Sequence, residues 1–310
     1  MARPIRLPKP LVSGDSVAVV AASSCLEGEE SLARLDAGIA IVESWGLVVE
    51  RKPLRSWGYL AGSDQERSAD LRTERPGKEP AVSLLACMRG GWGSARLLER
   101  PLAIGPTWLL GFSDVTSLLW AQVAQGHGGA IHGPLLTSLA AEPAWSQQRL
   151  RSLLFGEPLA DLAGEGWCPG LAEGPLLVAN LTVATHLLGT PHWPDLEGAI
   201  LVLEDVGEAP YRIERMLTHW RLGGALQRLA GIGLGSFSGC DDPTTPERSS
   251  FSLEEVLRER TADLGIPVVA GLPIGHGDCN AALPLAVRAQ LDGTGGRLGL
   301  LPYGALESEP

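Results

Sequence analysis

The first half of the chain alternates short apolar runs with segments of helical periodicity. Residues 16–22 and 81–86 are apolar runs that predict buried strands, and between them residues 31–45 repeat apolar side chains at the spacing of one helix face. Gly46 is placed to end that helix. Strands that alternate with helices are typical of a parallel sheet covered by helices on both faces. We therefore predict an α/β protein whose N-terminal part is a Rossmann-like open parallel sheet.

The length of the chain indicates more than one domain. At 310 residues it exceeds the usual size of a single domain, so two domains with separate cores are expected. Residues 155–175 are dense in Gly, Pro and acidic residues, which is typical of a connection between domains. We predict an N-terminal domain over 1–154, a linker over 155–175 and a C-terminal domain over 176–310.

Composition and charge exclude several classes of partner. The chain has 25 Lys and Arg against 36 Asp and Glu, a formal net charge of −11, so a surface that follows nucleic-acid phosphates is not expected. Its five cysteines are an odd number without a CxxC pair, which favours a reducing cytoplasm over a disulfide framework or a zinc ribbon. No apolar run approaches the ~18 residues that a membrane span needs. We expect a cytoplasmic protein with neither nucleic acid nor membrane as partner.

Ser113 lies where an apolar strand that stops at Gly111 meets an amphipathic helix that begins at Asp114. A serine on such a turn projects its hydroxyl over the carboxyl edge of a parallel sheet, beside the free N–H groups of the new helix. That is the geometry of a serine nucleophile. A serine before a helix is also an ordinary N-cap, so this segment alone leaves both interpretations open.

Two further polar residues directly follow apolar strands, at the edge where open α/β sheets bind ligands. Glu204 ends an aliphatic run, and its carboxylate could instead pair with an arginine of the next helix. His276 lies on a loop between two glycines, which can aim its imidazole, although a lone loop histidine is often only a surface residue. Together with Ser113 they suggest a triad in which the serine attacks a carbonyl, the histidine moves the proton and the glutamate orients the histidine.

Backbone amides could stabilise the oxygen anion that such an attack creates. The N–H of Asp114 is one candidate donor. The loop Arg89–Gly93 offers others at Gly90 and Gly91, where missing side chains permit close approach. The loop could also be a plain tight turn, or a phosphate cradle, but it lacks the GxGxxG spacing of dinucleotide sites.

Other groups offer weaker chemistry. Cys87 also follows an apolar strand and could be a thiol nucleophile or a buried inert cysteine. His132 could line the cleft or close a strand end. His276, Asp278 and Cys279 lie close in sequence, but no second cluster completes a coordination shell, so we predict no metal.

Taken together, the chain resembles the LD-carboxypeptidases, also called muramoyltetrapeptide carboxypeptidases, with the microcin-immunity serine peptidases as a close branch. The resemblance covers most of the chain in the family's order. The similar segments are SGDSVAVVAASS, MRGGWGSARLL, LLGFSDVTSLLWA, IHGPLL, AEGPLLVANLTVATHLLGTP, ILVLEDVGEAPYRIERMLTHWRLGG, GIGLGSFSGC and GIPVVAGLPIGHG.

The resemblance implies a catalytic triad of Ser113, Glu204 and His276, with Asp114 and a glycine of the Gly90–Gly91 pair as oxyanion donors. It implies an N-terminal Rossmann-like domain joined to a smaller, β-rich swivelling α/β domain, with the active site between them and a homodimer as the usual assembly. It also implies catalysis without a metal or other cofactor.

The activity that the resemblance implies is hydrolysis of an L,D peptide bond. Through an acyl-enzyme, such a serine carboxypeptidase releases terminal D-alanine from cytoplasmic murein tetrapeptides in cell-wall recycling. The alternatives are a microcin-immunity-type peptidase that cleaves peptidyl or aminoacyl nucleotides, and a non-catalytic small-molecule binding protein on the same scaffold. The diaminoacid before the scissile bond stays open.

Four residues are candidates for substrate binding: Arg89, Trp92, His132 and Asn180. The family commonly has GGNL where this chain has Val178-Ala179-Asn180-Leu181, so the close backbone approach that paired glycines permit is expected to differ here. The murein peptide is favoured over a microcin-like substrate, and the choice between them stays open.

Overall fold

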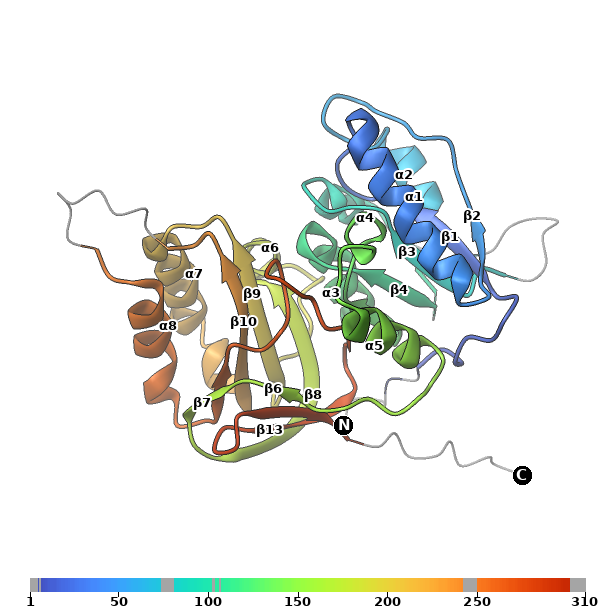
Figure 1. Cartoon of the computed structure of the whole chain (residues 1–310). Helices are drawn as coiled ribbons and strands as arrows, with labels where there is room; N and C mark the ends of the chain where they lie inside the picture. The colour runs from blue at the N-terminus through green and yellow to red at the C-terminus, as the bar shows by residue number, and fades with distance from the viewer. Residues whose placement is uncertain are drawn as a thin grey trace. The chain divides into compact units, whose positions relative to one another are not determined.

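The computed structural model describes residues 5, 7–73, 81–101, 104–105, 107–241 and 250–301. The chain divides into two compact units, each built from three segments (Figure 1). The N-terminal unit comprises residues 1–158, 186–194 and 278–285. The C-terminal unit comprises residues 159–185, 195–277 and 286–310.

The N-terminal unit is built on a six-stranded sheet of order β12-β5-β4-β3-β1-β2. Its strands are parallel except for β12, which runs antiparallel to β5. The strands are β1 (Ser16–Val20), β2 (Val48–Glu50), β3 (Leu84–Cys87), β4 (Trp108–Gly111), β5 (Ala130–His132) and β12 (Leu283–Pro284). The helices are α1 (Gly28–Ser44), α2 (Asp64–Asp70), α3 (Thr116–Ala124), α4 (Leu136–Leu139), α5 (Ala144–Leu154) and the 3₁₀ turns η1 (Ser94–Glu99) and η2 (Ser113–Val115).

The central strands of this sheet are buried along their whole length. Every residue of β1, β3 and β4 is buried, as expected when both faces of a parallel sheet are covered, which is why these strands are continuous apolar runs in the sequence. The predicted Rossmann-like open sheet is confirmed.

The C-terminal unit contains an eight-stranded sheet of order β6-β14-β13-β8-β9-β10-β11-β7. Strands β8 to β11 are parallel, and antiparallel strands flank them on both sides. The strands are β6 (Leu162–Ala163), β7 (Glu165–Cys168), β8 (Leu171–Asn180), β9 (Ile200–Val206), β10 (Gly231–Ser238), β11 (Val268–Ala270), β13 (Arg288–Asp292) and β14 (Arg297–Leu300). The helices are α6 (Leu181–Leu187), α7 (Pro210–Leu222), α8 (Leu253–Thr261) and the turns η3 (Leu226–Arg228) and η4 (Ala262–Leu264).

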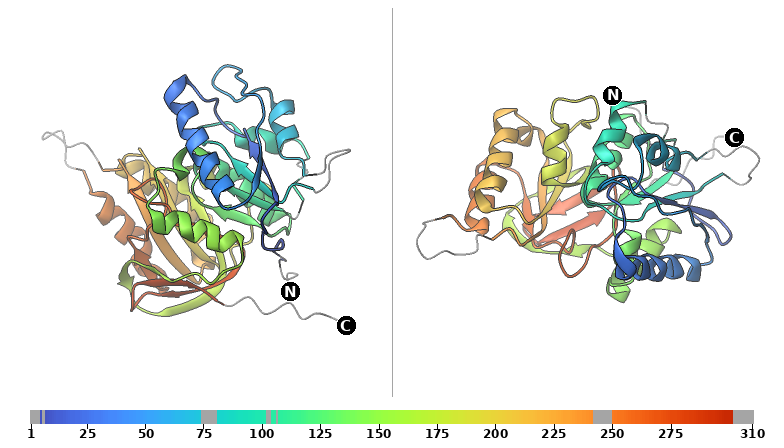
Figure 2. Two further views of the ribbon diagram at one scale, coloured as in Figure 1. Left: turned by 45° about the vertical axis from the view of Figure 1, so that its right-hand side comes forward. Right: turned by 90° about the horizontal axis from the view of Figure 1, so that it is seen from above.

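Helices α7 and α8 pack side by side along this sheet (Figures 1 and 2). The smaller, β-rich character expected of the C-terminal part is confirmed. Among the helices in the described ranges, none has the length and apolar character that crossing a membrane would take.

Most of the segment 155–175 that we expected to be a linker is part of the second sheet. It contains β6, β7 and the start of β8. Its glycines serve close packing, since a Cβ built on Gly166 would lie 2.2 Å from the carbonyl oxygen of Gly293, and one on Gly174 would lie 2.0 Å from that of Gly198. Glycine in a strand can mark such close backbone approach, which composition alone does not distinguish from a loop.

Helix α1 approaches α4 through a glycine. A Cβ built on Gly38 would lie 1.8 Å from the carbonyl oxygen of Leu136, so the two backbones touch where any larger residue would separate them. Leu35, Ile39 and Val42 extend the same buried face of α1.

We therefore expect Gly38→Ala to destabilise the protein. In an exposed helix interior the change would add about 1 kcal/mol of stability through helix propensity, but here the clash should reverse the sign and cost about 1–3 kcal/mol. Urea unfolding measures this. Ala40→Gly, on the exposed face of α1, is the control for propensity alone and should cost about 1 kcal/mol. A Gly38→Ala protein more stable than wild type would contradict the packing described.

Candidate active site

Ser113 occupies a strained turn between β4 and α3. Its φ is 61°, and among the described residues it shares a positive φ with only one other non-glycine residue, Ala286. A left-handed backbone costs a non-glycine residue about 1–2 kcal/mol, and such strain clusters at functional sites. The tight turn also requires Gly111, whose Cβ would lie 2.6 Å from Val115 Cγ1. The strand-to-helix turn predicted around Ser113 is present.

The ordinary N-cap interpretation of Ser113 is wrong. The N-cap of η2 is Phe112 and that of α3 is Val115, and no side chain caps either helix. Ser113 is the first residue of η2, with the left-handed φ that a strand-to-helix nucleophile turn uses.

The loop Arg89–Gly93 passes directly beside Ser113. A Cβ built on Gly90 would lie 3.0 Å from both Cβ and Oγ of Ser113, so a side chain at Gly90 would press on the serine. Gly91 has a φ of 107°, a conformation that side chains rarely adopt. Among the interactions of the described residues, neither amide of the Gly90–Gly91 pair is used as a donor. The predicted oxyanion loop is therefore adjacent to the predicted nucleophile.

Asp114 contributes more than its backbone amide. Its side chain is 1% exposed, and its Oδ2 accepts a hydrogen bond of 2.8 Å from the amide of Ser94 at the start of η1. Burial raises the pKa of this carboxyl, while hydrogen bonds from Ser23, Ser94 and Gly93 oppose the shift. Sequence reasoning used only the amide of Asp114, although a carboxylate placed directly after the serine could have indicated a partner nearby.

The substrate-binding candidates of this loop differ in their surroundings. Arg89 Nη1 donates a hydrogen bond of 2.7 Å to the carbonyl oxygen of Cys25, so part of its guanidinium is committed to the fold. The amide of Trp92 donates to Ser24 Oγ at 3.0 Å, while the residue is 44% exposed. Trp92 is thus partly exposed, whereas one guanidinium nitrogen of Arg89 is bonded to the backbone.

Glu204 and His276 form a hydrogen-bonded pair in the C-terminal unit. Glu204 lies near the end of β9 with no exposed surface, and its Oε2 is 2.6 Å from Nδ1 of His276, on the loop after β11. Gly275, with a φ of 107°, makes the contact possible, because a Cβ there would lie 2.7 Å from Oε2 of Glu204. When Nδ1 donates to the carboxylate, Nε2 is the nitrogen that can accept a proton.

The alternative partner for Glu204, an arginine of the next helix, is wrong. Arg212 instead bonds to Glu208 and Tyr211 within its own helix region. Burial raises the pKa of Glu204, and the neighbouring charge of Asp205 adds to this, whereas the hydrogen bond and charge of His276 oppose it.

Asn180 belongs to a buried polar network rather than to an open surface. It is 4% exposed, its Nδ2 donates to Asp205 Oδ1 at 3.2 Å, and its Oδ1 accepts from the amide of Val183 at 3.0 Å. Asp205 Oδ2 also accepts from the amide and hydroxyl of Thr182 at 2.9 and 2.8 Å. A hydrogen bond from Asn180 also opposes the raised pKa of Glu204, which links the network to the Glu204–His276 pair. Sequence reasoning missed Asp205, although a second acid follows Glu204 directly.

The replacement of paired glycines by Val178 and Ala179 falls in the core of β8. Both side chains are fully buried, opposite Val202 and Leu203 of β9. Their side chains are thus accommodated as ordinary strand packing, and Asn180 stays in register with Glu204.

His132 and Cys87 are both fully buried. The ring of His132 packs 5.6 Å from that of Phe112, centroid to centroid, beside the turn that carries Ser113. Burial raises the pKa of the Cys87 thiol, which disfavours the thiolate that a nucleophile needs. In the part of the chain that the structure describes, no three His, Cys, Asp or Glu side chains gather as a metal site would need.

The structure thus assembles the predicted site residues in two groups. Ser113, Asp114 and the Gly90–Gly91 pair lie in the N-terminal unit, and Glu204 with His276 lies in the C-terminal unit. Sequence reasoning identified both groups because each member follows an apolar strand.

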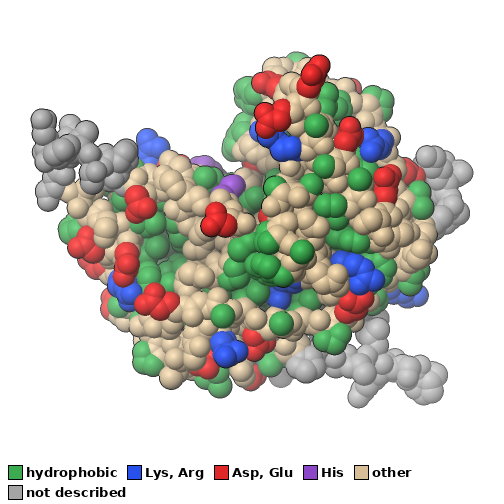
Figure 3. Space-filling view, viewed as in Figure 1, with side chains coloured by type: hydrophobic (Ala, Val, Ile, Leu, Met, Phe, Trp, Pro, Cys, Tyr) green, Lys and Arg blue, Asp and Glu red, His purple; other side chains and the backbone are tan. Residues whose placement is uncertain are grey.

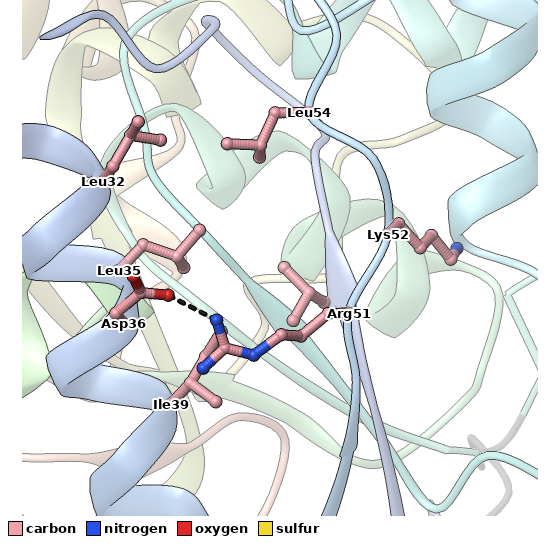
Figure 4. Close-up of a pocket in the computed structure, with 8 residues that line it drawn as sticks. Leu32, Leu35, Asp36, Ile39, Arg51, Lys52 and Leu54 are labelled. Carbon is pink, nitrogen blue, oxygen red and sulfur yellow. Dashed lines mark hydrogen bonds and ion pairs between the residues drawn. The ribbon is translucent and has the colours of Figure 1, made fainter. Parts of the chain in front are cut away.

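A separate hollow of about 220 Å³ lies between α1 and the segment after β2 (Figure 4). Leu35 and Ile39 of α1 line one side, and an ion pair between Asp36 and Arg51 spans it. None of the predicted site residues lines this hollow.

The strain at Ser113 gives the first prediction for the site. Ser113→Gly and Ser113→Ala both lack the hydroxyl, but only glycine adopts the left-handed backbone without cost, so the glycine variant should be more stable by about 1–2 kcal/mol. Thermal or urea unfolding tests this. At Ser117, in helical backbone within α3, the order should reverse by about 1 kcal/mol. Equal stability of the two Ser113 variants would show that the backbone there is unstrained.

The buried carboxyl of Glu204 gives the second prediction for the site. The pKa of Glu204 is raised above the ordinary 4.5, so the folded state binds the proton more tightly than the unfolded state. The contribution of Glu204 to stability therefore falls as pH rises from 4.5 through the pKa of the folded state. Glu204→Gln should therefore gain stability relative to wild type on going from about pH 4.5 to about pH 8. Urea unfolding at both pH values measures the difference.

Glu255→Gln is the control with the opposite sign. Hydrogen bonds from Ser252 lower the pKa of Glu255, so the wild-type carboxyl contributes stability above its ordinary pKa that is lost as pH falls. If Glu204→Gln shows the same pH trend as Glu255→Gln, the effect assigned to burial of Glu204 is wrong.

Comparison with known proteins finds matches to both halves of the chain. Residues 17–133 match the LD-carboxypeptidase N-terminal domain and residues 173–291 match the LD-carboxypeptidase C-terminal domain. The chain is 48% identical over 299 residues to a protein of Synechocystis sp. assigned by name to the carboxypeptidases, covering 95% of this chain and 97% of that protein. It is 38% identical to the murein tetrapeptide carboxypeptidase of Pseudomonas aeruginosa, covering 76% and 80% of the two chains.

Solved structures show the same fold. The muramoyltetrapeptide carboxypeptidase from Oxalobacter formigenes superposes with a TM-score of 0.80 at 27% identity, over 93% of this chain and 100% of that one. The microcin C7 self-immunity protein MccF has a TM-score of 0.82 at 20% identity, over 96% and 98% of the two chains, a likeness of fold alone. The chain therefore belongs to the LD-carboxypeptidase family.

Proposed function

We propose that this protein is a serine carboxypeptidase that releases terminal D-alanine from murein tetrapeptides by hydrolysis of an L,D peptide bond. The observation that carries the proposal is the left-handed Ser113 held beside the Gly90–Gly91 pair. The hydrogen-bonded Glu204–His276 pair supports it, because it supplies an oriented base of the kind that activates a serine.

In the proposed reaction, Ser113 Oγ attacks the carbonyl carbon of the scissile bond while His276 Nε2 takes its proton. The oxygen anion accepts hydrogen bonds from the amides of Asp114 and the Gly90–Gly91 pair. His276 then gives its proton to the departing amine of D-alanine, which leaves an ester on Ser113. Water, deprotonated by His276, attacks this ester, and the serine regains its proton as the tripeptide acid leaves.

Glu204 acts through His276 in this scheme. Its carboxylate accepts a hydrogen bond from Nδ1–H, which fixes the tautomer with an unprotonated Nε2 and stabilises the imidazolium when it forms. The scheme requires the two groups of residues to meet during turnover, and it uses no metal or other cofactor.

The family and its relatives support the choice of substrate. A relative named for murein tetrapeptide cleavage and a fold neighbour named for muramoyltetrapeptide both indicate a murein peptide. The net charge of −11 and the scattered basic side chains on the face shown in Figure 3 do not favour a polyanionic partner. We place the activity in cytoplasmic peptidoglycan recycling and expect a homodimer.

The proposal is tested by incubating the protein with a murein tetrapeptide and following the products by mass spectrometry. Wild type should release one alanine, and Ser113→Ala should lower the rate by at least about 10³-fold while the protein stays folded. Ser44→Ala, at the exposed end of α1, is the matched control and should be fully active. The same tetrapeptide with terminal L-alanine should not be cleaved.

Three results would contradict the proposal. Release that persists in Ser113→Ala would remove the serine mechanism. Hydrolysis of an aminoacyl nucleotide without hydrolysis of the tetrapeptide would favour a microcin-immunity-type activity. A tetrapeptide that binds without turnover, together with no labelling of Ser113 by a fluorophosphonate, would indicate a binding protein.

A further inference from the structure

The loop Arg89–Gly93, beside Ser113, contains three glycines and therefore has a flexible backbone of its own. Gly90 must lack a side chain, and Gly91 and Gly93 have φ values of 107° and 123°. Glycine loses more conformational freedom on ordering than any other residue, so a loop of this kind depends on bonds from outside it. Oxyanion donors act only when they are fixed before the charge develops.

The outside bonds come from several elements of the N-terminal unit. Arg67, which is fully buried, donates from Nη1 to the carbonyl oxygen of Gly93 at 2.7 Å. Ser24 Oγ accepts from the amide of Trp92 at 3.0 Å. These bonds fix the loop to α2 and to the segment that follows β1.

A further set of bonds joins the loop to the turn that carries Ser113. Ser94, which follows the loop directly, donates from its amide to Asp114 Oδ2 at 2.8 Å and from its hydroxyl to the Asp114 carbonyl oxygen at 2.6 Å. Ser117 also donates to this carbonyl oxygen at 2.8 Å. Two hydrogen bonds therefore join Asp114 to Ser94, and they connect the turn that carries Ser113 to the end of the loop.

Burial of the Asp114 carboxyl carries a desolvation cost, which a polar group with only a packing role would not need. A carboxylate that is 1% exposed loses most of its hydration, and Asp114 has no arginine, lysine or histidine among the partners that the structure shows for it. A serine or threonine in place of Asp114 could accept the hydrogen bond from the Ser94 amide without burying a charge. A charged acceptor gives shorter and stronger bonds to amides than a neutral one.

We propose that Asp114 is a positioning residue whose carboxylate holds the Arg89–Gly93 loop in register with Ser113, so that the glycine amides meet the oxygen anion. The inference rests on the proposed function of Ser113. It assigns to the Asp114 side chain a role separate from the donor role of its own amide.

The test compares Asp114→Ala and Asp114→Asn with wild type in kcat, in KM and in hydrogen exchange of the loop amides. Asp114→Ala removes the acceptor and should lower kcat by about 10–10³-fold, up to the loss of about 10³-fold that removal of an oxyanion donor can cause, with KM within about threefold. Asp114→Asn keeps one oxygen acceptor and should fall between Asp114→Ala and wild type. Exchange of residues 89–94 should rise in the same order.

Glu157→Gln is the control. Glu157 is an acid of the same unit that accepts hydrogen bonds from Arg151 and from the Ser152 hydroxyl, outside both the loop and α2. Its substitution should lower stability without raising hydrogen exchange of residues 89–94. Under conditions where the variant stays folded, its kcat should equal that of wild type. If Asp114→Ala fails to fold, the inference is tested by Asp114→Asn alone, from its kcat and from hydrogen exchange of residues 89–94.

Unchanged kcat, or a raised KM at unchanged kcat, would overturn the inference. A lower kcat without faster exchange of the loop would also overturn it. Failure of the proposed function has a different signature, namely a wild-type protein that releases no alanine, and the exchange measurement still reports whether Asp114 fixes the loop in that case.

Discussion

The left-handed backbone of Ser113 is the constraint on which the candidate site depends. It forces a sharp turn at the end of β4, which requires Gly111 before it and brings Gly90 against the serine. The free-energy cost of this backbone conformation must be offset by favourable interactions around the turn. The continuous apolar core of β1, β3 and β4 and the hydrogen bonds of Asp114 hold the turn in place.

Much of this could be predicted from the sequence, because its signals are local. Apolar runs before Ser113, Glu204 and His276 indicate strand ends, and the carboxyl ends of parallel strands share one edge of their sheet. That rule accounts for the meeting of Glu204 and His276 on the second sheet, whereas Ser113 lies at the edge of the first. The pairing of Glu204 with His276 at 2.6 Å follows the predicted triad, although their separation in sequence gives no direct sign of contact. Their roles in catalysis remain a prediction.

What the sequence did not reveal depends on contacts between distant segments. The glycines of 155–175 resemble a flexible connection, and only the position of Gly293 and Gly198 shows that they permit tight strand packing. The hydrogen bond from Asn180 to Asp205 joins segments far apart in sequence, and substrate binding by Asn180 stays a prediction. His132 is likewise enclosed by the fold, because β12, far along the chain, covers its strand.

The path of the chain has a consequence for how the protein can be made or divided. Strand β12, from residues 278–285, completes the edge of a sheet whose other strands all lie within the first half of the chain. During synthesis the edge of β5 therefore stays unpaired until residues 283–284 have emerged from the ribosome, and an open edge invites pairing with another chain. Any single cut that separates residues 1–158 from residues 278–285 therefore leaves the N-terminal unit without its β12 strand.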